Sequence, residues 1–299
     1  MYQLYDDRLA DGVRRIVDEQ IDQAIAELRG QTDGNRDEEV HAARKRCKRL
    51  RALLRLVRDR LGVDVYRYEN VAIRDAARRL SPVRDAHVLV LTLDDVVTDQ
   101  RLDAATVRDL RRQLKAAHDR MRRQMLYRGT ATEQAIGELV AVRDRSRHWP
   151  LDGLDFEDLR SGLARVYRRG RKRMTQAYAA PSPERFHEWR KRAKCLWHHL
   201  ELLEPAWPGP LDALARETHQ LSDLLGDEHD RTVLEEWLCE HRGAIADPQT
   251  ARVLMAVLDE QRGDLRAAAR QLGAKIYAET PEQFTGRLSR YWVAGRIAA

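Results

Sequence analysis

Residues that interrupt helices or cross-link a chain are scarce in this sequence. Only 16 of the 299 residues are glycine and 9 are proline, and aromatic residues make up 6%. The three cysteines, Cys47, Cys195 and Cys239, lie far apart without a Cys-x-x-Cys pair, so we expect neither a disulfide framework nor a thiolate metal site. No uncharged stretch approaches the roughly 20 residues that cross a bilayer, and the N-terminus lacks the pattern of a signal peptide. We therefore expect a cytoplasmic protein that makes no membrane contact.

Sequence motifs for catalysis are also missing. There is no Gly-Lys dipeptide, which a Walker loop requires, and no Gly-x-Gly-x-x-Gly, Gly-x-Ser-x-Gly or His-Glu-x-x-His pattern. Cys47 falls in an apolar stripe, where a thiol is inert. We expect a protein that is not an enzyme, has no catalytic residue and holds no cofactor.

Hydrophobic residues (43%) and charged residues (34%) are abundant. With so little glycine and proline, this balance indicates long helices joined by short turns. Ser182-Pro183-Glu184 and the acids at 37–39 are typical of helix starts. Apolar periodicity predicts helices at about 9–28, 37–61, 64–80, 83–98, 101–128, 155–179, 183–204, 209–225, 229–243 and 248–276. The fold class that we predict is all-α.

Two motifs occur twice at nearly the same spacing. The matching pairs are Val40–Leu50 with Phe186–Leu196, and Leu80–Asp85 with Leu225–Asp230. The histidines of the first pair are 146 residues apart, and the leucines of the second pair 145, which indicates an internal duplication. The boundary falls near Trp149–Gly153. Because short connections favour antiparallel packing, we predict two antiparallel helical bundles, residues 1–150 and 151–299, related by a pseudo-twofold axis.

Each of the two repeated helices has an apolar stripe on one side and a basic face on the other. At roughly 100° per residue, Cys47 and Trp189 fall in the two apolar stripes. The first basic face consists of His41, Arg44, Lys45, Lys48, Arg51 and Arg55, and the second of His187, Arg190, Lys191, Lys194 and His198.

Acidic residues are nearly absent from these faces. A solvated helix face, which is the simpler interpretation, interleaves both charges so that i,i+4 pairs form. No Asp or Glu occurs in 40–58, and only Glu188 interrupts the second face. Segment 160–178, which includes Arg168 and Arg171, is acid-free as well. Since guanidinium groups can bond two phosphate oxygens at once, we expect these stretches to bind a linear polyanion, with inorganic polyphosphate as the first candidate.

Histidine begins both basic faces. A helical histidine is usually a structural hydrogen-bonding residue, but the cations around His41 and His187 repel a metal ion and favour a role as phosphate donor. Segment 227–230 with His219 is the one place where the sequence offers hard metal ligands. Acids at a helix N-terminus give the same pattern, so we expect no bound metal.

The doubled pattern His-x-x-Arg-Lys-x-x-Lys-x-Leu at 41–50 and, with Cys195 interposed, at 187–196 resembles the CHAD family, the conserved histidine α-helical domain. Segments 163–171 and 224–230 resemble that family too. The resemblance implies two helical bundles with a basic channel or surface between them, non-catalytic binding of inorganic polyphosphate, and in some members association with polyphosphate granules. Together with the basic stretches, it gives the candidate polyphosphate-binding residues His41, Arg44, Lys45, Lys48, Arg51, Arg84, Arg168, Arg171, His187, Arg190, Lys191, Lys194, His198 and His229.

The chain departs from a symmetric member of that family in one respect. Arg74 and Arg84 stand in the first half where His219 and His229 stand in the second, which indicates unequal binding by the two halves. Relatives often carry a triphosphate-tunnel domain, but its Glu-x-Glu-x-Lys signature is absent, so we expect a stand-alone member.

Two other functions compete with polyphosphate binding. A nucleic-acid-binding protein also uses acid-free basic helices, but it usually interleaves them with aromatic residues that stack on bases, and these faces have none. A polyphosphate hydrolase needs a metal held by carboxylates near the basic face, and the sequence offers too few. Nucleic-acid binding is therefore the alternative that we retain.

Overall fold

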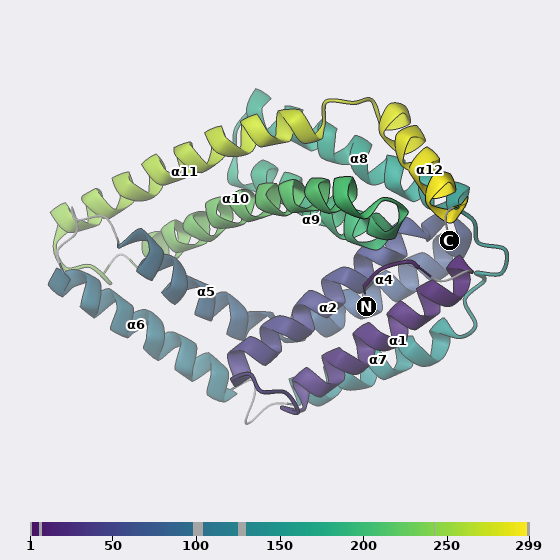
Figure 1. Ribbon diagram of the computed structural model, residues 1–299. Coiled ribbons are helices and arrows are strands. Elements are labelled where there is room, and N and C mark those ends of the chain that lie inside the picture. The colour runs from purple at the N-terminus through teal and green to yellow at the C-terminus, as the bar shows by residue number, and fades with distance from the viewer. Residues whose placement is uncertain (1, 6–7, 98–103, 125–129, 242, 298–299) are drawn as a thin grey trace.

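The computed structural model of the chain describes residues 2–5, 8–97, 104–124, 130–241 and 243–297, without the side chains of 82–84 and 296–297. These residues form twelve α-helices and no strand (Figure 1), which confirms the predicted all-α class. No helix in the described ranges combines the length and the apolar character needed to span a bilayer.

The first seven helices follow the predicted order with two differences. They are α1 (Leu9–Leu28), α2 (Arg36–Leu56), α3 (Arg58–Leu61), α4 (Val63–Arg79), α5 (Ser81–Val96), α6 (Ala104–Arg122) and α7 (Ala131–Ser146). The single helix predicted at 37–61 is divided, because the backbone leaves helical geometry at Val57, with φ −92° and ψ 12°. Helix α7 has no counterpart in the prediction.

The remaining helices show one wrong prediction. They are α8 (Phe156–Ala179), α9 (Pro183–Leu203), the 3-10 helix η2 (Glu204–Ala206), α10 (Pro208–Glu240), α11 (Pro248–Ile276) and α12 (Pro281–Ile297). We predicted separate helices at 209–225 and 229–243, but α10 runs through both without a break. Gly226 keeps helical geometry inside α10, so this glycine does not end a helix. Helix α12 was not predicted.

Side-chain caps fix the starts of the two helices that carry the basic faces. Asn35 accepts hydrogen bonds from the backbone N–H groups of Asp37 and Glu38, and the Glu38 carboxylate accepts one from the Asn35 N–H. At the start of α9, Ser182 Oγ accepts the N–H of Arg185 at 3.4 Å. These caps satisfy N–H groups that lack partners within a helix, and the predicted start at Ser182 is confirmed.

Helices α2 and α9 pass through the centre of the core. Cys47 of α2 and Trp189 of α9 are buried, as their apolar stripes predicted, and one continuous apolar cluster contains residues from both halves of the chain. Gly162 lets α8 contact the end of α2, because a Cβ at this position would lie 2.1 Å from the Leu56 carbonyl oxygen. The duplication and its pseudo-twofold axis stay predictions.

The two halves meet in two zones. Near the C-terminal ends of α2 and α9, Arg49 Nη2 lies 3.0 Å from Glu201 Oε1. Farther along, α5 contacts α10, where Arg231 Nη2 lies 2.5 Å from Asp95 Oδ2 and a second apolar cluster forms. Figure 1 shows α9 and α10 above α2 and α5. Helix α9 approaches α2 in the first zone, and α10 approaches α5 in the second. Both basic faces begin at the N-terminal ends of α2 and α9, and most of each face therefore lies between the zones.

Candidate functional site

Helices α9 and α10 bring the second basic face together with the Leu225–Asp230 motif. The imidazole rings of His187 and His229 lie 4.1 Å apart between centroids, at an interplanar angle of 42°. Gly226, one turn before His229, lies under the guanidinium of Arg190, and a Cβ on Gly226 would be 3.1 Å from Arg190 Nη2. Two motifs that are separate in the sequence therefore form one cluster on adjacent helices.

Polar atoms in this cluster are buried without partners. His187 Nδ1 and Arg190 Nε have no hydrogen-bond partner among the described residues. Burial, the neighbouring His229 and the charges of Lys191 and Arg190 lower the pKa of His187 to about 4. Burial and the same two cations lower the pKa of His229 to about 4. Both rings are therefore neutral near pH 7, and a nearby anion would favour their protonated forms.

Lys194 continues the cluster toward α2. Burial lowers the pKa of its ammonium group to about 8. The charges of Arg190 and Lys45 also lower this pKa, whereas Asp223 and Asp230 raise it. Since Lys45 belongs to α2 and Lys194 to α9, the two basic faces act on each other electrostatically across the helix pair.

The exposed lysines of the two faces differ in their pairing. Lys191 forms an ion pair with Glu188, which also contacts Arg192 at 3.6 Å. Lys45 is exposed and forms no ion pair with a described residue, while His41 and Lys48 on the same helix are half-buried. Exposed ion pairs such as that of Lys191 contribute little and are easily exchanged for another anion.

The arginines of the first basic face bind neighbouring helices. Arg44 Nη1 donates to the Ala77 carbonyl oxygen at 3.1 Å and also contacts Ser81 Oγ. Arg51 Nε donates to Asn70 Oδ1 at 3.0 Å. Burial lowers the pKa of Arg44, and lowers that of Arg51 to about 10. These two side chains therefore hold α2 against α4 and the start of α5.

His198 lies in the interior and not on the polar face, so its predicted position is wrong. Its side chain is 2% exposed, and its Nδ1 lies 2.7 Å from Glu201 Oε2. The ring also makes an edge contact with Tyr2, at 6.0 Å between centroids. Burial lowers the pKa of His198 to about 4, although Glu201 opposes this. The N-terminal segment and α2 cover α9 at this turn, which the periodicity of α9 alone does not reveal.

Arg168 and Arg171 project from α8 toward other helices. Arg168 Nη2 lies 3.0 Å from Glu282 Oε1 of α12. Arg171 is exposed and lines a cavity of about 310 Å³ with Lys172, Thr175 and the first residues of α12. The structure therefore places both arginines on the α8 surface beside α12, apart from the His187–His229 cluster. The side chain of Arg84 lies outside the described residues.

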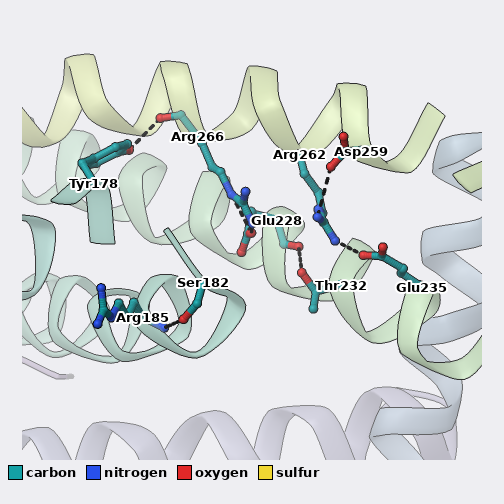
Figure 2. A network of polar contacts seen from close by, with 9 residues as sticks. All are labelled: Tyr178, Ser182, Arg185, Glu228, Thr232, Glu235, Asp259, Arg262 and Arg266. Carbon is teal, nitrogen blue, oxygen red and sulfur yellow. Dashed lines mark hydrogen bonds and ion pairs between the residues drawn. The ribbon is translucent and has the colours of Figure 1, made fainter. Parts of the chain in front are cut away.

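Glu228 is a structural residue of the site, a role that the sequence did not indicate. It is 1% exposed, and its Oε1 accepts hydrogen bonds from Arg266 Nε at 3.0 Å and Arg266 Nη2 at 2.6 Å. Tyr178 donates its hydroxyl to the Arg266 carbonyl oxygen at 2.7 Å, and the Thr232 hydroxyl bonds the Glu228 carbonyl oxygen (Figure 2). This network fixes α10 against α11 at the residue next to His229. Glu228 sits inside a long helix, so its interpretation as an acid at a helix start is wrong.

The acidic segment 227–230 does not converge with His219 on one point. His219 packs on Trp197 at 3.8 Å between ring centroids, and its Nδ1 lies 3.1 Å from Asp223 Oδ2. In the described part of the chain, one set of side chains converges in the way that metal ligands do. It consists of Asp37 on α2, His87 on α5 and His118 on α6.

A known protein family matches most of the chain. The family model of the CHAD domain matches residues 15–239, a range that contains both basic faces and the Leu225–Asp230 motif. No curated protein matches the chain. Because the family match covers well over half of the 299 residues, the chain belongs to the CHAD domain family.

Proposed function

We propose that this protein binds inorganic polyphosphate, without catalysing a reaction, through the second basic face and His229, with Lys45 contributing from α2. The observation that carries the proposal is the cluster of half-buried basic side chains on α9 and α10, in which the rings of His187 and His229 lie 4.1 Å apart and Arg190 Nε has no partner among the described residues. The pKa of Lys194 is lowered to about 8 and those of His187 and His229 to about 4. Such groups gain from an anion because it offsets both burial and mutual repulsion.

A phosphate polymer suits this arrangement better than a small anion. His187, Arg190 and Lys194 follow one another along a single face of α9, where residues three and four apart are neighbours. Lys45 adds a charge from a second helix. A chain with a negative charge on every unit can contact these groups in succession, and guanidinium groups favour phosphate oxygens.

Aromatic residues support the polyphosphate proposal over binding of nucleic acid. The large exposed aromatic side chains of the described residues are Tyr5, Tyr68 and Trp207, and none belongs to a basic face. Trp197, beside Lys194, is buried between His198 and His219. A surface for single-stranded nucleic acid would present such rings to the bases.

A titration at two salt concentrations tests the proposal. The purified chain is titrated with long-chain polyphosphate, tripolyphosphate and duplex DNA, since the slope of log affinity against log salt counts ionic contacts. We expect the long polymer to bind more tightly than tripolyphosphate, and to lose less affinity with salt than DNA does. Lys194→Met should weaken binding, whereas Lys275→Met, at an exposed position of α11, should not. DNA binding as tight as that of polyphosphate would reject the proposal in favour of nucleic acid.

A granule location follows from the same proposal. If the protein binds long polyphosphate in the cell, it should be found on polyphosphate granules, where the polymer is concentrated. A fluorescent fusion of the chain should co-localise with granules, and its Lys194→Met variant should be dispersed. If the wild type and the Lys194→Met variant localise equally to granules, a feature other than the second basic face directs the protein to them.

A further inference from the structure

Two histidines and an aspartate converge where α5, α6 and the first turn of α2 meet. The ligating atoms of Asp37, His87 and His118 all lie within 4.8 Å of one another. Within this cluster, His118 Nε2 and Asp37 Oδ1 are 3.3 Å apart. Two ligands on a tetrahedral zinc ion, with bonds near 2.1 Å, are separated by about the same distance, roughly 3.4 Å.

We propose that Asp37, His87 and His118 bind a divalent transition-metal ion, with Zn²⁺ as the best match. Two imidazoles and one carboxylate form a ligand set that zinc accepts, and three protein ligands leave the fourth position open. The site is separate from the His187–His229 cluster and does not depend on polyphosphate binding.

The surroundings of His118 favour a metal ligand. Its Nδ1 lies 3.4 Å from Asp119 Oδ1, while its Nε2 is directed at Asp37 Oδ1, 3.3 Å away. Metal-bound histidines commonly have a carboxylate partner of this kind, which fixes the ring and raises its basicity.

The position of His118 in α6 is also informative. Leu110 and Leu114 belong to the buried stripe of α6, and His118 follows in the same phase and is 6% exposed. A buried imidazole in a core stripe needs polar partners. The carboxylates of Asp37 and Asp119 are two such partners of His118. A cation bound between His118 and Asp37 would offset the negative charge of these carboxylates. A cavity of about 740 Å³, lined by all three proposed ligands, gives an ion access.

Two of the basic residues around this cavity are neutralised by acids of their own. Arg111 is paired with Asp94 at 2.9 Å, and Arg112 is paired with Asp109. Arg108, Lys115 and Arg122 also line the cavity, and Arg122 competes with the ion because its Nε lies 3.8 Å from Asp37 Oδ1. Replacing this arginine should therefore tighten metal binding, which would not be expected if the cluster were only structural.

The test is a metal titration of the full chain without a polyhistidine tag, in a buffer free of phosphate. Calorimetry with Zn²⁺ should show one ion per chain, and Co²⁺ should give the intense visible absorption of a tetrahedral site. Asp119→Asn should weaken binding about ten- to hundredfold, and His87→Ala or His118→Ala should weaken it at least as much. Arg122→Gln should strengthen it. The matched control is His148→Ala, because His148 is exposed on another surface.

The same titration can overturn the proposal. Absence of one-to-one binding, or equal binding by the wild type and the His87→Ala variant, would show that His118 only bridges two carboxylates. Circular dichroism verifies that each variant folds. If His118→Ala unfolds, His87→Ala and Asp37→Asn decide the outcome, since both positions are less buried than His118. If the wild-type chain binds Zn²⁺ but does not bind polyphosphate, the proposed function is rejected and the metal site is retained.

Discussion

The two basic faces have nearly the same sequence but different surroundings. On α9, the ring of His187 packs on His229, and polar atoms of His187 and Arg190 are buried without partners among the described residues. On α2, Arg44 and Arg51 donate to groups of α4 and α5. The same motif therefore holds helices together in the first copy and leaves buried basic groups without partners in the second. We expect the second face to supply most of the anion affinity.

The largest effect should come from the network that supports the second face. Arg266→Ala leaves the buried Glu228 carboxylate unpaired, and losing one partner of a buried pair costs about 3–5 kcal/mol. We expect the free energy of unfolding at pH 7, measured with urea, to fall by about this amount. Burial raises the pKa of Glu228, so the loss should shrink as the pH falls and the carboxyl becomes neutral. The control is Arg252→Ala, an exposed arginine on the same helix, and an equal loss there would contradict the assignment.

Charge reversal on both faces should reveal whether they share one polymer. Lys45→Glu and Lys191→Glu should each weaken polyphosphate affinity by about tenfold, as expected for one charged contact. The double variant should weaken it by more than about hundredfold, because the polymer loses contacts on both helices. Affinity is measured by fluorescence anisotropy. A double variant no weaker than one of the single variants would mean that the faces do not act together.

Matched arginine variants compare the faces directly. Arg190→Ala should weaken polyphosphate binding by about tenfold or more, since it removes a charged donor from the cluster. Arg44→Ala should change affinity much less and should instead lower the melting temperature, because Arg44 ties α2 to Ala77 and Ser81. The reverse pattern would assign the ligand to α2. Calorimetry and thermal denaturation measure the two quantities.

A smaller effect is expected from pH. Anion binding should raise the pKa of His187 and His229 from about 4, so protons are taken up and affinity should increase a few-fold from pH 8 to pH 6. Without ligand the sign differs: folded pKa values below the ordinary 6.5 mean that stability decreases as the pH falls from about 6.5 to about 4. A flat affinity profile would remove histidine charge from binding.

Most helices could be predicted from the sequence because their apolar periodicity is strong. Helix α10 was divided wrongly at Gly226–Glu228, where glycine and acids are typical of helix ends and starts, whereas Gly226 makes room for Arg190. Glycine is required at this position because the side chain of Arg190 on α9 packs against it. The apolar periodicity of α10 does not show which side chains of other helices pack against α10. Helices α7 and α12 were missed entirely.

The spatial grouping of the candidate residues could be predicted in part, whereas their role in binding stays a prediction. The matching motifs identified His187, Arg190, Lys194 and His229, which the structure brings together. The absence of acidic residues from segment 40–58 was less informative about a binding site, because acids on other helices pair with basic residues of this segment. Arg49 of α2, for example, pairs with Glu201 of α9. Charge pairs between distant segments cannot be read from i,i+4 spacing. For the same reason, His198 was placed on the surface, and the convergence of Asp37, His87 and His118 went unseen.

The most direct test of the central claim is the titration of individual imidazoles by NMR, with and without long-chain polyphosphate. His187→Gln and His229→Gln variants assign the two resonances. In the free protein both pKa values should lie near 4, and saturating polyphosphate should raise both toward the ordinary histidine value of about 6.5. Unchanged pKa values at saturation, with the polymer demonstrably bound, would contradict binding at the second basic face.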